Sequence, residues 1–239
     1  MHERPKLGTR PAPKIRPATY LFAARALRDF GDGFVAILLP VYLLALGFSP
    51  LQVGIIATAS LFGSALLTIA VGLLGARCDL RQLLLAATGL MMATGVAMAM
   101  VNEYALLLVI AFVGTINPSA GSVSVFVPLE HAALTREVTD LERTKMFARY
   151  SLVGVLASAV GALAAAMPDF MGTLGLDRLT AIKLMFVLYA LVGVIGGLLY
   201  ARIPRRRRVT GPEEASALGP SRAIVLNPHS PSKSLISLS

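Results

Sequence analysis

Four charged residues interrupt the first long apolar stretch of the chain, in the sequence Arg25-Ala-Leu-Arg28-Asp29-Phe-Gly-Asp32-Gly. Helical geometry places all four on an arc of about 100°. Arg25 and Asp29 are four residues apart, as are Arg28 and Asp32, so each charge has an opposite partner one turn away. A carboxylate in this setting can exchange a proton or bind a cation. Asp32, which two glycines flank, is our candidate for that role.

A second polar stripe falls in the apolar stretch 104–127 and just beyond it. Its members recur at spacings of three or four residues: Gly114, Asn117, Gly121, Ser124 and Pro128. This spacing predicts one face of a continuous helix. Such a face either packs closely against a neighbouring helix or lines a polar cavity. In the second case Asn117 is the candidate solute contact.

The elements that must position these residues are long apolar segments. Of the 239 residues, 56% are hydrophobic and 15% are charged, whereas soluble domains carry about 25% charge. Segments of about 20 apolar residues span a hydrocarbon core about 30 Å thick. The sequence therefore predicts an all-α fold, a polytopic membrane protein with a six-transmembrane-helix bundle. We place its helices at 19–46, 51–75, 82–101, 104–127, 146–167 and 180–201.

The position of the first charge cluster allows two interpretations. A charged side chain inside a membrane helix costs about 2.5–3.5 kcal/mol on insertion scales. Arg25, Arg28 and Asp29 could therefore form an interfacial cluster whose arginines extend to the headgroups. Alternatively the cluster faces the interior of the bundle, and Asp32 is the deepest of the four residues.

Basic residues between the predicted spans lie almost entirely on alternate sides. One side has Arg4, Lys6, Arg10, Lys14, Arg16, Arg77, Arg81, Arg136, Arg143, Lys145, Arg149, Arg202 and Arg205 to Arg208. The opposite side has Arg178, with Lys183 just inside the last span. Because basic loops stay in the cytoplasm, both termini are predicted to be cytoplasmic. The same asymmetry explains the net charge of +9 without a nucleic-acid partner.

No enzymatic centre is apparent in the sequence. Cys78 is the only cysteine, and Cys/His metal spacings are absent. Glu130 and His131 follow the stretch 104–127, but no nucleophile or phosphate-binding loop accompanies them. We therefore predict no enzyme activity, no cofactor and no metal site, and we expect Glu130 to form a cytoplasmic ion pair with Arg149.

The two ends of the chain differ in composition from its centre. Residues 1–17 are basic and Pro-rich, which predicts a cytoplasmic tail. Residues 209–239 are rich in Ser, Pro and Gly, which predicts a second flexible cytoplasmic tail after the membrane domain 18–208. Within it, residues 218–226 look like the start of a further span that then turns into Ser and Pro. That pattern is typical of a truncated or frameshifted product.

The loop between the second and third predicted spans reads Gly72-Leu-Leu-Gly-Ala-Arg77-Cys-Asp79-Leu-Arg81. It resembles the Gly-x-Leu-Ala-Asp-Arg-x-Gly-Arg-Arg signature of the major facilitator superfamily. Ala76 stands in place of the Asp, Asp79 in place of the second Gly and Leu80 in place of an Arg. Residues 28–34, 112–119 and 127–130 resemble a bacterial branch of that family with poorly defined substrates. The resemblance covers about residues 18–208.

This resemblance implies a transporter that moves a small solute by alternating access. Asp32 is the candidate group for coupling that movement to protons. The resemblance also implies a gate near the loop 72–81 and a solute or ion site within the bundle. The gating candidates are Gly72, Arg77, Asp79, Arg81, Glu130 and Arg149, and the solute or ion candidates are Asp32, Asn117, Asp29 and Arg28. The implied location is the bacterial inner (plasma) membrane.

Family members usually have two six-helix halves with the solute between them, and the six predicted spans correspond to the N-terminal half. Besides the lipid bilayer, the solute and protons, the expected partner is therefore a second copy of the chain or a separate second half. The alternative is a truncated or half-size membrane protein that has no transport activity of its own and associates with a partner.

Overall fold

A computed structural model describes residues 17–74, 79–116, 118–119, 124–134 and 140–203. Every regular element in these ranges is an α-helix, which confirms the predicted all-α class. In chain order the helices are α1 (Pro17–Ala45), α2 (Pro50–Leu74), α3 (Leu80–Met100), α4 (Tyr104–Val113), α5 (Phe126–Leu134), α6 (Asp140–Ala164), α7 (Met167–Thr173) and α8 (Arg178–Ala201).

Among the described residues, four segments are long and apolar enough to cross a membrane: Pro50–Leu73, Leu80–Met100, Thr144–Thr173 and Arg178–Ala201. The third of these joins α6 to α7. The first helix, α1, has 29 residues but contains the charged cluster, and α4 is a shorter apolar helix of 10 residues. Together these six segments correspond to the six predicted spans.

The predicted continuous helix over 104–127 was wrong, because α4 ends at Val113. The Gly114 amide still donates to the carbonyl of Ile110 at 2.8 Å, but its backbone is extended. Four residues later Pro118 has no N–H to return to Gly114, and a proline disfavours helical geometry in the residue before it. Gly114 and Ser124 are outside any helix, so the predicted stripe is not one continuous helix face; its members Asn117 and Gly121 lie outside the described residues. The next helix among the described residues is α5.

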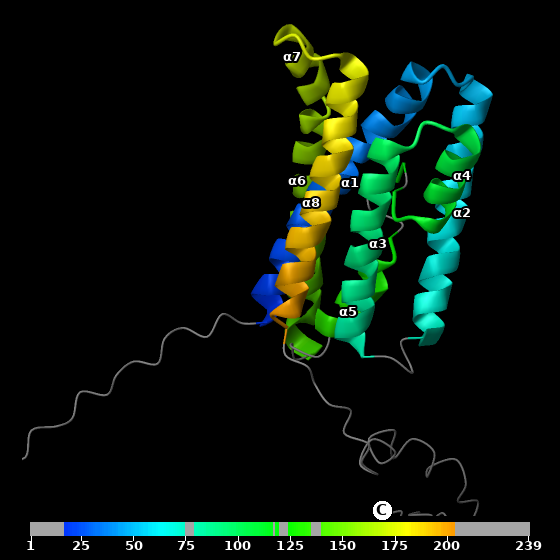
Figure 1. The fold of residues 1–239 in the computed structure, drawn as a ribbon. Helices are drawn as coiled ribbons and strands as arrows, with labels where there is room; N and C mark the ends of the chain where they lie inside the picture. Colours follow the sequence, from blue (N-terminus) through cyan, green and yellow to red (C-terminus); the bar gives the residue numbers. More distant parts are fainter. Residues whose placement is uncertain (1–16, 75–78, 117, 120–123, 135–139, 204–239) are drawn as a thin grey trace, which may run out of the picture. The chain divides into compact units, whose positions relative to one another are not determined.

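The helices pack in pairs within the described part of the chain. The first helix lies against α6 and α8, α3 lies against α8, and α2 lies against α4 (Figure 1). Two glycines allow α1 and α6 to approach closely. A Cβ on Gly33 would lie 2.2 Å from the carbonyl oxygen of Ser158, and one on Gly161 would lie 2.0 Å from that of Phe30. Small residues at such crossings are typical of membrane helix pairs.

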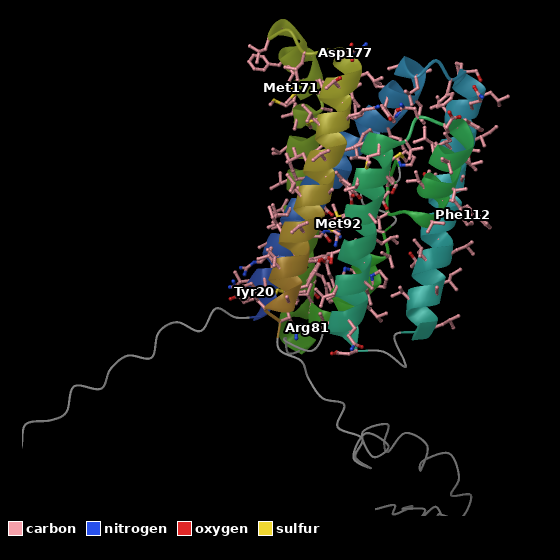
Figure 2. The ribbon with its side chains drawn as sticks, viewed as in Figure 1. Tyr20, Arg81, Met92, Phe112, Met171 and Asp177 are labelled. Atoms are coloured by element: carbon pink, nitrogen blue, oxygen red, sulfur yellow. The ribbon has the colours of Figure 1, made fainter. Side chains whose placement is uncertain are left out.

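Local hydrogen bonds define the end of α1 and the start of α8. After α1, Gly47 has a φ of 88°, and Phe48 N donates to the carbonyl of Leu43 at 3.2 Å. This is the six-to-one bond of a glycine-terminated helix, which satisfies a carbonyl that the helix leaves open. At the start of α8 the Asp177 carboxylate accepts from the Thr180 amide at 3.2 Å. Figure 2 shows Tyr20 and Arg81 at one end of the bundle and Asp177 at the other.

Large apolar side chains cover the outside of the long helices. Leu66 on α2, Leu152 on α6 and Leu198 on α8 are 43%, 57% and 62% exposed, and Phe112 projects from α4 (Figure 2). A water-soluble protein rarely exposes so much contiguous apolar surface. Lipid is the solvent that this surface fits.

Candidate functional site

The charged face of α1 is turned into the protein. Arg25, Arg28, Asp29 and Asp32 are only 9%, 3%, 1% and 7% exposed. Since α1 has 29 residues and rises about 1.5 Å per residue, Asp32 lies near the midpoint of a helix about 43 Å long. The cluster is thus enclosed by neighbouring helices, unlike an interfacial cluster whose arginines extend to the headgroups.

Ion pairs connect these four side chains along one face. Arg25 Nε lies 2.6 Å from Asp29 Oδ2, although its N–H does not point at that oxygen. Arg28 Nη2 donates to Asp29 Oδ1 at 3.2 Å. The second predicted pair is looser, because Arg28 Nε and Asp32 Oδ2 are 4.0 Å apart. Asp29 therefore has two close cations, and Asp32 has only a distant one.

The helix after the break, α5, adds a third carboxylate to the cluster. Glu130 is completely buried, and its Oε1 accepts from Arg28 Nη1 at 2.9 Å. The hydroxyls of Tyr150 on α6 and Tyr200 on α8 also donate to this carboxylate. The predicted ion pair between Glu130 and Arg149 was wrong, since Arg149 is exposed on α6. Burial explains the difference, because an enclosed carboxylate needs partners that are enclosed with it.

Aromatic rings complete the walls around the two guanidinium groups. The Arg28 guanidinium lies 4.6 Å from the ring centre of Phe126, one turn before Glu130 on α5. The Arg25 guanidinium lies 4.6 Å from the ring centre of Tyr150, and Arg25 Nη1 donates to that tyrosine hydroxyl at 3.1 Å. Stacking on a ring face stabilises a cation where water is excluded.

Asp32 makes a hydrogen bond that is separate from those around Glu130. The Tyr189 hydroxyl on α8 donates to Asp32 Oδ1 at 3.0 Å. The same phenol oxygen lies 3.2 Å from Thr115 Oγ1, in the segment that follows α4. Asp32 is thus linked to the described residues at the helix break.

The cluster holds more acidic than basic groups. Arg25 and Arg28 face Asp29, Asp32 and Glu130, and all five side chains are buried. If every carboxyl were ionised, one negative charge would have no counterion. Burying an uncompensated charge costs several kcal/mol even after relaxation. The site therefore favours the uptake of one proton or another monovalent cation.

The gating candidates are spread over different environments. Gly72 is exposed on α2, with no atom within 4 Å of the place of a Cβ. Asp79 begins α3, where its carboxylate accepts from the Arg81 amide at 3.4 Å. Arg81 Nη2 donates to the carbonyl of Ala201 at 2.6 Å, which joins the start of α3 to the end of α8. Arg77 and the solute candidate Asn117 lie outside the described residues.

Sequence reasoning missed the tyrosines and Phe126. Tyr150, Tyr189 and Tyr200 are each no more than 1% exposed, within apolar helices. A buried tyrosine hydroxyl needs a hydrogen-bond partner. Tyrosines inside apolar spans were therefore a usable signal for a polar site, although the spans alone do not say which carboxylate each one meets.

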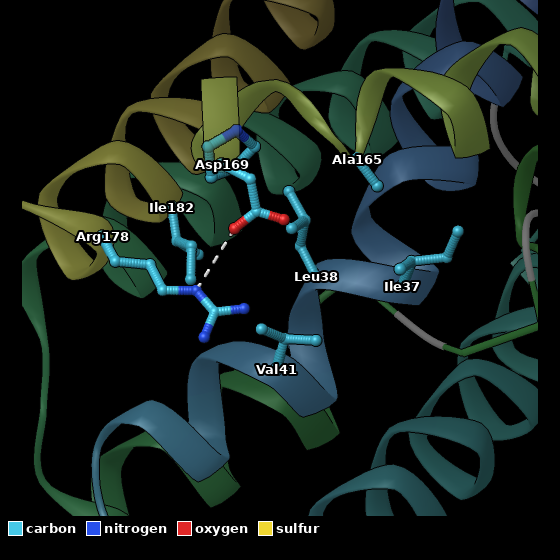
Figure 3. Close-up of a pocket in the computed structure, with 8 residues that line it drawn as sticks. Ile37, Leu38, Val41, Ala165, Asp169, Arg178 and Ile182 are labelled. Atoms are coloured by element: carbon cyan, nitrogen blue, oxygen red, sulfur yellow. Dashed lines mark ion pairs between the residues drawn. The ribbon is translucent and has the colours of Figure 1, made fainter. Parts of the chain in front are cut away.

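A small pocket of about 110 Å³ lies apart from this cluster (Figure 3). Ile37, Leu38 and Val41 of α1 and Ile182 of α8 form its apolar walls. At its rim Asp169 Oδ1 pairs with Arg178 Nε at 3.5 Å, and both side chains are largely exposed. Few polar groups converge on this pocket, whereas sites that orient a small molecule usually have several. The buried cluster is the stronger candidate site.

Comparison with known proteins agrees with this architecture. The model of the family described as the Major Facilitator Superfamily matches residues 21–236. The chain belongs to the major facilitator superfamily. It is also 27% identical, over 178 residues, to a protein of the yeast Saccharomyces cerevisiae named "Uncharacterized membrane protein YJR124C". The match covers 73% of this chain and 40% of the yeast protein, so the chain spans less than half of that relative.

Membership of the major facilitator superfamily makes this a multi-pass membrane protein of a transporter type. Within it, the described charged cluster joins the first helix to three others through Glu130, Tyr150, Tyr189 and Tyr200. A buried ionisable group in a membrane span usually marks a solute or ion pathway.

Proposed function

We propose that this chain forms one six-helix half of a transporter that moves a small solute by alternating access, coupled to protons through Asp32. The observation that carries the proposal is the charge imbalance of the buried cluster, in which three carboxyls face two guanidinium groups. A proton on one carboxyl makes the cluster neutral. Loss of that proton leaves a charge that a conformational change can expose to water.

Asp32 is the carboxyl best placed to bind the proton. Glu130 accepts from Arg28 at 2.9 Å, and Asp29 has cationic nitrogens at 2.6 and 3.2 Å. The nearest cationic nitrogen to Asp32 is 4.0 Å away. Since a close cation stabilises the ionised form, Asp32 is the least compensated of the three carboxylates.

The remaining site residues take supporting roles in this proposal. Arg28 and Asp29 contribute charge beside Asp32, and Asn117 contacts the solute. Gly72, Arg77, Asp79 and Arg81, at and around the connection between α2 and α3, are the gating residues of this proposal, together with Glu130 and Arg149. The contact between Arg81 and the end of α8 supports this role, because opening a gate there would separate the start of α3 from the end of α8 and break this hydrogen bond.

Transport by this family requires a second six-helix body. In such folds the solute binds near the midplane between two repeats, and residues 17–203 provide one of them. We propose that the second body is another copy of this chain or a separate chain, in the bacterial inner membrane with both termini cytoplasmic. The other candidate function is a half-size protein that binds a partner without transport activity.

A hydrophobic carbodiimide tests the proton site without knowledge of the solute. This reagent modifies protonated carboxyls in apolar surroundings, and mass spectrometry locates the adduct. We expect an adduct at Asp32 that declines as the pH rises and is absent from Asp32→Asn. Asp169, whose side chain is 70% exposed, is the internal control and should remain unmodified. Modification of Glu130 or Asp29 in place of Asp32 would contradict the assignment.

The same substitution tests coupling in a complete transporter. In a reconstituted complex of two halves, or in a full-length relative, Asp32→Asn should abolish the pH dependence of uptake while membrane insertion is retained. Unchanged pH dependence of uptake in this variant would remove Asp32 from the mechanism.

A further inference from the structure

Tyr189 is held rigidly beside Asp32. Its side chain is fully buried on α8, and its ring packs edge-on against Phe34 with the ring centres 6.4 Å apart. The ring also lies against Gly31 of α1, where a Cβ would come within 3.1 Å of it. The position of the phenol oxygen is therefore set by packing on two sides, independently of the hydrogen bond that it makes.

The phenol oxygen joins two groups that lie far apart in the chain. Its hydroxyl donates to Asp32 Oδ1 at 3.0 Å, and the Thr115 hydroxyl lies 3.2 Å from the same oxygen. A phenol has one hydrogen to donate. While Asp32 is ionised and accepts that hydrogen, Thr115 must act as the donor to Tyr189. The three groups then form a directed hydrogen-bond chain from Thr115 to Asp32.

Thr115 stands where the fourth span loses its helical structure. It follows Gly114, whose missing Cβ would lie 2.5 Å from the Thr94 side chain of α3. The end of α4 is thus seated closely against α3, and Thr115 is placed with it. A movement of this segment would move the hydroxyl that supports Tyr189.

We propose that Tyr189 is a positioning residue for proton exchange at Asp32, and that Thr115 links this exchange to the segment after α4. The phenol occupies Oδ1, so Oδ2 is left as the oxygen that takes the proton. A change at the helix break is thereby transmitted to the carboxyl group. This inference rests on the proposed role of Asp32.

Infrared difference spectroscopy of the purified full chain in lipid nanodiscs provides a readout at Asp32 itself. Asp32 gives one band when its carboxyl is protonated and another when it is ionised. Each is identified as the band that disappears in Asp32→Asn. Hydrogen bonding lowers the frequency of a carbonyl stretch. Tyr189→Phe, which keeps the ring, should therefore move the protonated Asp32 band to higher frequency. In the ionised form the carboxylate band should shift as well.

Three further variants separate positioning from a general effect on stability. Thr115→Val should move the same band by a smaller amount, and Thr115→Ser, which retains a hydroxyl, should restore it. Tyr42→Phe is the matched control. Tyr42 is equally buried, but its hydroxyl oxygen lies 3.0 and 3.1 Å from the carbonyl oxygens of Met98 and Val101, one of which accepts its hydrogen. This variant should leave the Asp32 band in place.

The outcomes distinguish the two proposals. An Asp32 band that Tyr189→Phe leaves unmoved would overturn the role of Tyr189, even if the variant lowers thermal stability. If only the ionised band exists at every pH, the proton-coupling proposal fails. Tyr189 is then still tested by the shift of that ionised band.

Discussion

Removal of the Glu130 side chain tests whether the buried cluster holds the bundle together. Glu130→Ala leaves the Arg28 guanidinium, which is 3% exposed, without its partner at 2.9 Å. Breaking a buried ion pair from one side costs about 3–5 kcal/mol. Arg28 keeps Asp29 at 3.2 Å and the more distant Asp32, so we expect a cost near the lower end of this range. The two tyrosine hydroxyls that donate to Glu130 lose their acceptor as well.

The expected effect is large enough to measure in detergent. For a domain of this size, each kcal/mol moves the midpoint of thermal unfolding by about 2–4 °C, so Glu130→Ala should lower it by on the order of 10 °C. The assay heats a fluorescent fusion protein and follows the surviving monodisperse fraction by size-exclusion chromatography. Glu130→Gln, which keeps an acceptor oxygen but loses the charge, should lie between the wild type and Glu130→Ala.

Glu103→Ala provides the matched control. Glu103 precedes α4, is exposed, and makes no side-chain capping bond, so its removal should change stability by no more than about 0.5 kcal/mol. Equal melting of the two alanine variants would refute the reasoning. That result would mean that Glu130 is solvated, as its position just after an apolar stretch of the sequence suggests.

Four further predictions concern helix packing, capping, orientation and activity. Gly161→Ala should destabilise the protein by about 1–3 kcal/mol in the same assay, because its Cβ would meet the Phe30 carbonyl; Gly172→Ala has open space and should not. Asp79→Ala should cost about 0.5–2 kcal/mol of stability through loss of the α3 cap, and Asp79→Asn should retain most of it. Topology reporters fused at residues 48, 103 and 174 should read periplasmic and those at 79, 138 and 210 cytoplasmic, so a reproducible inversion at any site would contradict the orientation. The chain purified as a monomer by light scattering should show no saturable solute flux after reconstitution, whereas flux from a dimer would identify a second copy as the second six-helix body.

The apolar segments and their helical state could be predicted from the sequence, because each depends on local composition. The six predicted spans begin and end within a few residues of the observed helices, apart from the fourth and the fifth. The pairing of Arg25 with Asp29 was equally local, since residues four apart on a helix are neighbours. Pro118 favours a helix break, whereas the periodicity of small residues around it favours a continuous helix, and the sequence alone does not decide between the two.

Only the tertiary structure decided which groups meet in the buried cluster. Glu130 lies 102 residues from Arg28 along the chain, and Tyr189 lies 157 residues from Asp32. Such contacts depend on which helices pack together and on their rotation about their own axes, and no local pattern specifies either. From the sequence, a carboxylate that follows an apolar stretch is expected to be solvated. The packing of α5 against α3 and α1, together with Tyr150 of α6 and Tyr200 of α8, instead enclosed Glu130. Enclosure made the partners of each charge decisive for both stability and proton binding.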